Sequence, residues 1–326
     1  MIDQNQIFNI ETEAEFNDLA LQIFRFQFEN NPIYRSFCDL LYKNPSDINV
    51  VEDIPFLPIQ FFKSHQVISS SEAIKKTFSS SGTTGSITSK HHITELSIYQ
   101  NSFKKCFSAF YGNIRDYVVL ALLPSYLERK GSSLIYMVDS LIKDSKHPES
   151  GFYLDNLSAL SETLNHLDAK GKKVLLIGVS FALLDLVETQ SFNLNNTIIM
   201  ETGGMKGRRK ELIREELHAV LKSGFGVNVI HSEYGMTELL SQAYSKGNGV
   251  FNLPNWMRIL TRDTEDALSL TKKGKTGGIN VIDLANINSC SFIATQDLGK
   301  VNIDGSFEII GRFDTSDIRG CNLMVL

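Results

Sequence analysis

The stretch KKVLLIGVSFALLDLVET (172–189) decides the fold class of this chain. Its first half is a short apolar run that is typical of a strand, and its second half has the apolar spacing of a helix. The same alternation continues on both sides, from YVVLALLP (117–124) to NTIIMETGG (196–204) and VNVIHSEYG (227–235). Strand patterns that alternate with helix patterns predict an α/β fold with a parallel sheet.

The pattern divides the chain into three sections of one predicted domain, residues 1–326. Residues 1–75 have the spacing of amphipathic helices, followed by the proline-containing extended stretch IPFLPIQFFKSH (54–65). Residues 76–249 form the predicted α/β core. Residues 250–326 contain short β-like runs separated by Gly, Asp and Asn, which predicts a small β-rich subdomain.

Composition limits the classes of function. With 326 residues, 42% hydrophobic content and a formal net charge of −5, the chain can bury a core but lacks the basic surface that nucleic acids require. Residues 1–20 are acidic and polar, and no apolar run approaches the roughly 20 residues that span a bilayer. We therefore expect a cytoplasmic protein without membrane insertion. Its four cysteines are too scattered to predict a disulfide framework or a zinc site.

A Ser/Thr/Gly-rich loop, FSSSGTTGSITSKH (78–91), is the strongest local indication of ligand binding. Glycines let the backbone approach a ligand closely, and hydroxyl and amide groups can donate hydrogen bonds to phosphate oxygens. The loop lacks the order of a Walker A motif, and a flexible polar loop would have a similar composition. The candidate nucleotide-binding residues in it are Ser80, Ser81, Gly82, Thr83, Thr84 and Gly85.

Three later segments carry polar residues or glycines at predicted strand ends. HSEYGMTE (231–238) follows the apolar VNVI, and ligands of parallel sheets bind at the carboxyl ends of strands. ETGGMKGRR (201–209) places glycines after a strand, which lets the backbone come close to a ligand. TQDLG (295–299) ends a strand in an acid that could accept hydrogen bonds from ribose hydroxyls.

The Ser/Thr/Gly-rich loop (78–91), the three later segments and GRFDTSDIRG (311–320) resemble motifs of the adenylate-forming superfamily of acyl-CoA synthetases, adenylation domains and firefly-type luciferases. They follow one another along the chain in the same order as in that superfamily. The lead IPFLPIQFFKS and the final DIRGCNLM make the chain similar to the LuxE-type acyl-protein synthetase branch. The resemblance implies the large N-terminal domain of that fold, with ATP and Mg²⁺ as cofactors. It also leads us to expect that the mobile C-terminal domain, which carries a catalytic lysine in the superfamily, is absent.

The resemblance implies roles for single residues. Tyr234 would stack on adenine, Thr237 would hydrogen-bond the α-phosphate and Glu238 would bind Mg²⁺. Asp297 would bind ribose, although Gln296 replaces the glycine of the usual TGD motif. The remaining candidates are Gly203, Gly204 and Gly235 at the nucleotide, Arg312 at ribose or phosphate, His92 at phosphate or carboxylate, and Cys321 as acyl acceptor.

The implied activity is that of an acid–thiol ligase: a carboxylic acid, expected to be a fatty acid, is joined to AMP and then transferred to a thiol. The acceptor could be Cys321, coenzyme A or the thiol of a carrier protein, and the LuxE branch implies an acyl-accepting reductase as partner. Cys321 could equally be a small buried residue, and His92 a structural residue at a loop end.

Three other functions stay open. The first is an acyl-CoA ligase of the phenylacetate-CoA ligase type. The second is a serine hydrolase, because GVSFA (178–182) is close to a nucleophile elbow and His218 or His231 could supply the base. The third is a nucleotide-binding subunit without catalytic activity.

Overall fold

The computed structural model describes residues 2, 4–80, 87–124, 131–203 and 212–313. It confirms the predicted α/β class. The chain forms two compact units: the first contains Met1–Thr77, Ser89–Leu96 and Asn255–Leu326, and the second contains Phe78–Thr88 and Ser97–Pro254. The N-terminal helices and the C-terminal strands of the described residues therefore belong to the same unit. No helix in the described part of the chain has the length and apolar character needed to cross a membrane.

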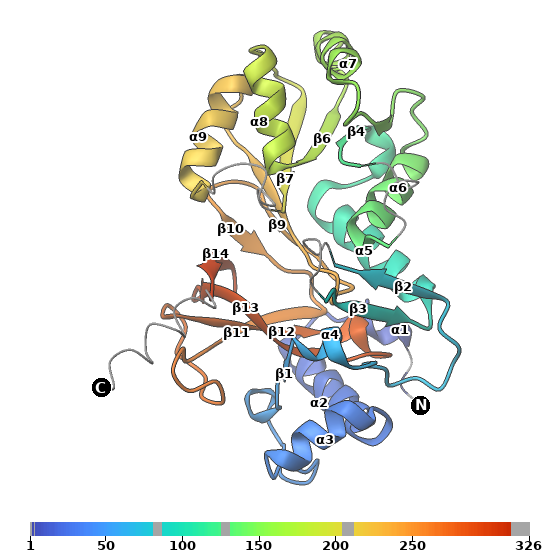
Figure 1. Cartoon of the computed structure of the whole chain (residues 1–326), viewed down its shortest axis with the longest axis vertical. Helices are drawn as coiled ribbons and strands as arrows, with labels where there is room; N and C mark the ends of the chain where they lie inside the picture. Colours follow the sequence, from blue (N-terminus) through green and yellow to red (C-terminus); the bar gives the residue numbers. More distant parts are fainter. Residues whose placement is uncertain (1, 3, 81–86, 125–130, 204–211, 314–326) are drawn as a thin grey trace. The chain divides into compact units, whose positions relative to one another are not determined.

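The second unit contains a sheet with the strand order β10-β9-β8-β7-β6-β4-β5 (Figure 1). Strands β4 and β6 are buried along their whole length, as expected for parallel strands that are covered on both faces. The parallel strands are β4 (Val118–Leu122), β5 (Gly151–Phe152), β6 (Val174–Val179), β7 (Thr197–Thr202) and β8 (His231–Tyr234), and the antiparallel ones are β9 (Ala243–Ser245) and β10 (Val250–Asn252).

Helices cover both faces of this sheet, with α8 and α9 on one face and α5 and α6 on the other (Figure 1). Helices α8 and α9 pack so closely that a Cβ atom at Gly224 would lie 2.4 Å from Cβ of Val187, so only glycine fits there. The helices of this unit are α5 (Leu96–Tyr111), α6 (Ser133–Ser145), α7 (Leu157–Ala169), α8 (Ser180–Thr189) and α9 (Arg214–Phe225), with the 3₁₀ turn η2 (Ile114–Asp116).

The first unit contains an antiparallel sheet in the order β11-β12-β13-β14, and the short strand β1 pairs in parallel with β13. This confirms the predicted β-rich C-terminal region and helical N-terminal section. The strands are β1 (Leu57–Pro58), β11 (Met257–Arg262), β12 (Thr276–Asp283), β13 (Phe292–Val301) and β14 (Phe307–Arg312). The helices are α1 (Gln4–Ile7), α2 (Glu13–Asn30), α3 (Pro32–Leu40) and α4 (Phe61–Ser64), with η1 (Val51–Asp53) and η3 (Leu284–Asn286).

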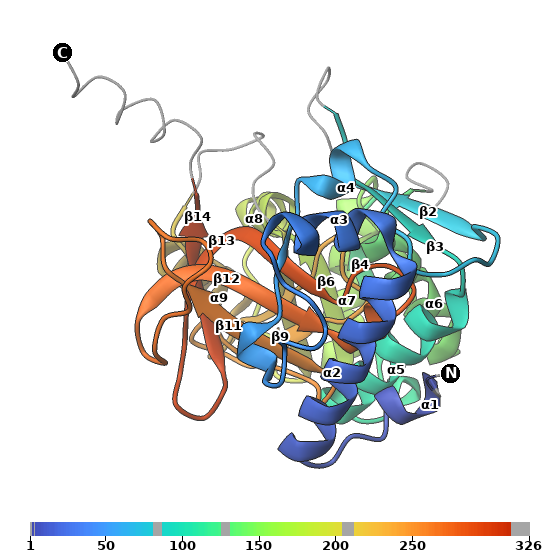
Figure 2. The same ribbon diagram turned by 90° about the horizontal axis from the view of Figure 1, so that it is seen from below.

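Helix α2 packs against the strands of its own unit (Figure 2). Thr12 and Glu15 form a capping box that satisfies backbone donors at its start. Phe24 meets Phe292 of β13 with ring centroids 6.2 Å apart. Gln27 is fully buried: its Nε2 donates to the carbonyl oxygens of Asn286 and Ile287 (both 3.0 Å), and its Oε1 accepts from the backbone N–H of Ser291 (2.9 Å).

Two boundaries differ from the sequence-based expectation. The strand expected at VNVI begins instead at His231, because pairing with β7 starts there, at Met200, while Val229 is 40% exposed. The last two residues of the Ser/Thr/Gly-rich segment, Lys90 and His91, begin a strand, β3 (Lys90–Ile93), which precedes helix α5 and pairs with β2 (Lys76–Ser79) in a two-stranded sheet.

The buried amide of Gln27 yields a stability prediction. Replacing Gln27 with Ala leaves two carbonyl groups and one N–H without their buried partner, so we expect the free energy of unfolding to fall by about 2–4 kcal/mol. A urea titration measures this. Gln60→Ala, at an exposed position without a side-chain capping bond, is the matched control and should change it by less than about 0.5 kcal/mol. Equal unfolding free energies for Gln27→Ala and wild type would show that these bonds do not stabilise the unit.

Candidate functional site

The predicted site residues fall into three groups. The first unit contains His92, Asp297 and Arg312. The second unit contains Ser80, Gly203, Tyr234, Gly235, Thr237 and Glu238. Ser81, Gly82, Thr83, Thr84, Gly85, Gly204 and Cys321 lie outside the described residues.

The carboxyl edge of strands β7 and β8 brings two of the predicted nucleotide contacts, Gly203 and Tyr234, close together. The parallel register pairs Thr202 with Glu233, so Gly203 and Tyr234 come next in their strands at the same edge of the sheet. Gly203 is exposed and has φ of 68°, a left-handed conformation that favours glycine. This edge is where parallel sheets bind ligands.

The start of the Ser/Thr/Gly-rich loop is held by backbone contacts. The N–H of Ser79, which precedes Ser80, donates to the carbonyl oxygen of Gly131 at 2.7 Å. A Cβ atom at Gly131 would lie 2.5 Å from Oγ of Ser79, so the two backbones approach closely. The backbone of Ser79, directly before the candidate residue Ser80, is thus held in place by Gly131.

Glu238 is the candidate Mg²⁺ ligand. It follows Thr237 in the turn after β8 and is only 5% exposed. Within the described ranges, no group of three or more His, Cys, Asp or Glu side chains could hold a metal ion. Mg²⁺ is commonly bound by one or two carboxylates together with nucleotide phosphates. A single carboxylate therefore fits an Mg²⁺ ion that is bound mainly by the phosphates.

A second buried acid, Glu233, lies next to Tyr234. Its Oε2 accepts a hydrogen bond from Oγ1 of Thr202 at 2.5 Å. Burial raises the pKa of Glu233 to about 7, with a smaller contribution from the neighbouring Glu201. A Cβ atom at Gly235 would come within 2.5 Å of its Oε1, so the carboxylate lies close to the backbone that follows Tyr234.

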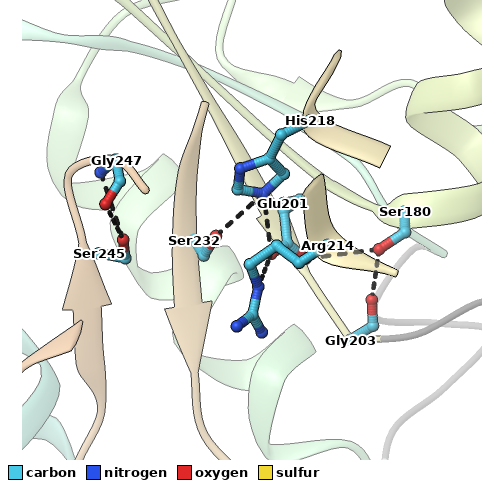
Figure 3. A network of polar contacts seen from close by, with 8 residues as sticks. All are labelled: Ser180, Glu201, Gly203, Arg214, His218, Ser232, Ser245 and Gly247. Carbon is cyan, nitrogen blue, oxygen red and sulfur yellow. Dashed lines mark hydrogen bonds and ion pairs between the residues drawn. The ribbon is translucent and has the colours of Figure 1, made fainter. Parts of the chain in front are cut away.

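On the other face of the sheet, Glu201 is the centre of a polar network (Figure 3). Ser180 Oγ lies 3.4 Å from Oε2 of Glu201 and donates to the carbonyl oxygen of Gly203 at 2.6 Å. Oε1 of Glu201 is 3.6 Å from Nε2 of His218 and 3.8 Å from Nε of Arg214. This network links the β6–α8 junction and helix α9 to the end of β7.

The same contacts argue against the serine hydrolase alternative. Ser180 is 2% exposed and its hydroxyl donates to a backbone carbonyl instead of a histidine. Nε2 of His218 lies 3.5 Å from Oγ of Ser232, and His231 shares a hydrogen bond with Tyr111 at 3.1 Å. A serine nucleophile requires a hydrogen-bonded base, and Ser180 has no such base among these histidines.

In the first unit, Asp297 and Arg312 are opposite one another on β13 and β14, with Nε of Arg312 2.8 Å from Oδ1 of Asp297. Asp297 is 4% exposed, whereas the side chain of Arg312 is 76% exposed. The buried Arg262 braces this sheet: it donates to the carbonyl oxygens of Ile279 (2.8 Å) and Thr295 (2.5 Å). Two residues that the sequence motifs assign separately to the nucleotide thus form an ion pair on neighbouring strands.

His92 is tied to its own strand pair. Its Nδ1 lies 2.9 Å from Oγ1 of Thr77, and burial together with Lys90 lowers the pKa of its ring. A neutral ring follows at neutral pH, so any contact that His92 makes with a ligand would be that of an uncharged imidazole.

Sequence reasoning missed Glu201, Glu233, Thr202 and Arg214. For Glu201 a signal was available: it is a charged residue in the largely apolar run TIIMET (197–202), and glycines follow this run. Buried charges need partners, so such a residue predicts a polar network at the strand end. The partners themselves come from distant parts of the chain.

The pKa of Glu233 predicts a pH-dependent stability. Between pH 4.5 and 7 the folded protein holds this proton and the unfolded chain does not, so stability falls as pH rises through this range. Glu233→Gln stays neutral. Its free energy of unfolding should match that of wild type near pH 4.5 and exceed it by up to about 3 kcal/mol at pH 8. Urea titrations at both pH values measure this, and a constant difference between the two proteins would contradict the assignment.

The chain is similar to one protein family and to solved structures. Residues 6–109 match the family model "Acyl-protein synthetase, LuxE". None of the curated proteins has a significantly similar sequence. ATP-bound MatB from Rhodopseudomonas palustris is a similar solved structure, with a TM-score of 0.55, 16% identity, and alignment over 74% of this chain and 49% of MatB. The chain thus spans about half the length of MatB.

A second solved structure, 2-hydroxyisobutyryl-CoA ligase in the postadenylation state with R3-HIB-AMP, has a TM-score of 0.68 and 13% identity, and aligns over 93% of this chain and 68% of the ligase. At these identities the likeness concerns the fold. The chain therefore has the fold of the adenylate-forming ligases, and its residues 6–109 match the LuxE acyl-protein synthetase family.

Proposed function

We propose that this chain activates a carboxylic acid with ATP, forming an acyl adenylate and pyrophosphate. The observation that carries the proposal is the carboxyl edge of β7 and β8, where Gly203 follows the last residue of β7, Tyr234 ends β8, and the buried Glu238 lies in the turn after β8. The similar MatB structure is ATP-bound, and the similar CoA ligase was solved with an AMP adduct, which supports the same use of this fold.

In the proposed first step, a carboxylate oxygen of the acid attacks the α-phosphorus of ATP. A bond forms between that oxygen and phosphorus, the bond to the bridging oxygen breaks, and pyrophosphate leaves with the electron pair. Thr237 would donate a hydrogen bond to the α-phosphate, and Tyr234 would hold the adenine ring. Mg²⁺, bound in part by Glu238, would neutralise phosphate charge. Catalysis of this kind depends on positioning and charge neutralisation.

In the proposed second step, a thiolate attacks the acyl carbonyl carbon and AMP leaves, which gives a thioester. The match to an acyl-protein synthetase family supports a protein thiol as acceptor, and a fatty acid is the acid that we propose. Cys38, Cys106 and Cys290 are fully buried, and burial raises the pKa of Cys38 to about 12. These three thiols are therefore poor nucleophiles, and Cys321 is the acceptor that we propose. Coenzyme A and a carrier-protein thiol are the alternative acceptors.

Glu238→Gln tests the first step. The amide keeps the shape of the side chain but loses the charge that binds Mg²⁺, so we expect acid-dependent pyrophosphate release to fall about 100-fold or more. Release is measured with Mg·ATP and a panel of short, long-chain and aromatic acids. Glu265→Gln, in an exposed loop, should keep the wild-type rate. Wild-type activity in Glu238→Gln would contradict the role of Glu238, and no release by wild type with any acid would contradict the proposed function.

Cys321→Ser tests the second step. Pyrophosphate release should continue, whereas thiol-labile acylation of the protein by a radiolabelled acid should be lost. Cys106→Ala, at a fully buried thiol, should retain the label. Label on the Cys321→Ser protein would rule out Cys321 as the acceptor. Release without label in wild type would indicate an external thiol such as coenzyme A.

A further inference from the structure

A continuous series of contacts in the second unit connects Gly203 to Tyr234 through side chains that the proposed reaction does not use. It begins where Ser180 Oγ donates to the carbonyl oxygen of Gly203 and lies against the carboxylate of Glu201 (Figure 3). Glu201 then meets Arg214, with 3.8 Å between Oε1 and Nε. These contacts hold the end of β7 from the face that carries α8 and α9.

Arg214 continues the series to the second strand end. Its guanidinium carbon lies 5.1 Å from the ring centroid of Phe251 on β10, a cation–π distance. The ring of Phe251 in turn packs against that of Tyr234, with centroids 5.9 Å apart and a T-shaped arrangement. The side chain of Arg214 therefore contacts two groups: Glu201, which lies next to Ser180 at Gly203, and the ring of Phe251, which packs against Tyr234.

The surroundings of Arg214 favour its contacts with both Glu201 and Phe251. Its side chain is 27% exposed and that of Glu201 is 9% exposed, so the pair is partly shielded from water and interacts more strongly than a surface pair. Gly249, with φ of 68°, leaves space for it: a Cβ atom there would lie 2.9 Å from Cδ of Arg214. A planar guanidinium can stack on a ring and pair with a carboxylate at once, which an ammonium group does less well.

We propose that Arg214 is a positioning residue that fixes the backbone of Gly203 and the ring of Tyr234 relative to each other, and thereby sets the selectivity of the site for the adenine base. This inference rests on the proposed function, in which these two residues hold adenine. Arg214 does not touch the reacting atoms, so its effect is on nucleotide recognition and not on the chemical step.

The test compares Mg·ATP with Mg·GTP in wild type and in Arg214→Met, which keeps the aliphatic stem but removes the charge and the planar group. We expect the Kd for Mg·ATP to rise about 10-fold, which corresponds to loss of about 1.4 kcal/mol, while the Kd for Mg·GTP changes less than about 2-fold. The kcat for pyrophosphate release should change less than about 3-fold at saturating ATP, and the KM for the acid should not change. Arg214→Lys should give intermediate ATP selectivity.

Arg115→Met, at an exposed position of the same unit, is the control and should match wild type in every measurement. If Arg214→Met is unfolded by circular dichroism, Phe251→Leu replaces it, because this variant removes the ring contact and leaves the pair of Arg214 with Glu201; it should lose ATP selectivity in the same way. Equal weakening of ATP and GTP, or no change in either, overturns the inference while the proposed function stands. A wild-type protein that neither binds Mg·ATP nor releases pyrophosphate overturns both.

Discussion

The parallel pairing of β7 with β8 is the constraint on which the candidate site depends. Its register places Thr202 beside Glu233 and Glu201 beside Ser232. Because side chains alternate between the faces of a sheet, the two buried acids point to opposite faces, Glu233 with Thr202 and Glu201 towards helices α8 and α9. Each acid then has its own partners, and Gly203 and Tyr234 leave the sheet together at its carboxyl edge. A shift of one residue would exchange the faces and leave both acids without these partners.

The fold class could be predicted because buried parallel strands are continuous apolar runs. The apolar run that begins at residue 172 contains strand β6 (Val174–Val179), and NTIIMETGG (196–204) contains β7 (Thr197–Thr202). Strand β8 could not be located in this way. Its residues His231, Ser232 and Glu233 are polar, so they do not form an apolar run. They are strand residues because they pair with β7 and β9, and such long-range pairing cannot be predicted from the local sequence. The grouping of the N-terminal helices with the C-terminal strands in one unit also depends on long-range contacts, such as those of Gln27 with Asn286.

The candidate site was predictable to the extent that motifs are local. Gly203, Tyr234 and Glu238 were identified from short segments, and the structure places them around one strand edge in the second unit. Arg214 and Glu201 were not, and Ser180 was noted only as the serine of a possible nucleophile elbow, because their contacts join the β6–α8 junction, the end of β7 and the start of α9. Motifs indicate which groups could meet a ligand, whereas the supporting contacts are determined by packing.

In the proposed reaction a carboxylate attacks the α-phosphate of ATP, and the fate of the carboxylate oxygen distinguishes this attack from the alternatives. The protein is incubated with Mg·ATP, a thiol acceptor and an acid labelled with ¹⁸O in its carboxylate, and the products are analysed by mass spectrometry. Attack at the α-phosphate predicts one ¹⁸O atom in AMP, because the acyl adenylate breaks at its acyl carbon. Label in inorganic phosphate together with ADP, or unlabelled AMP, would contradict the account.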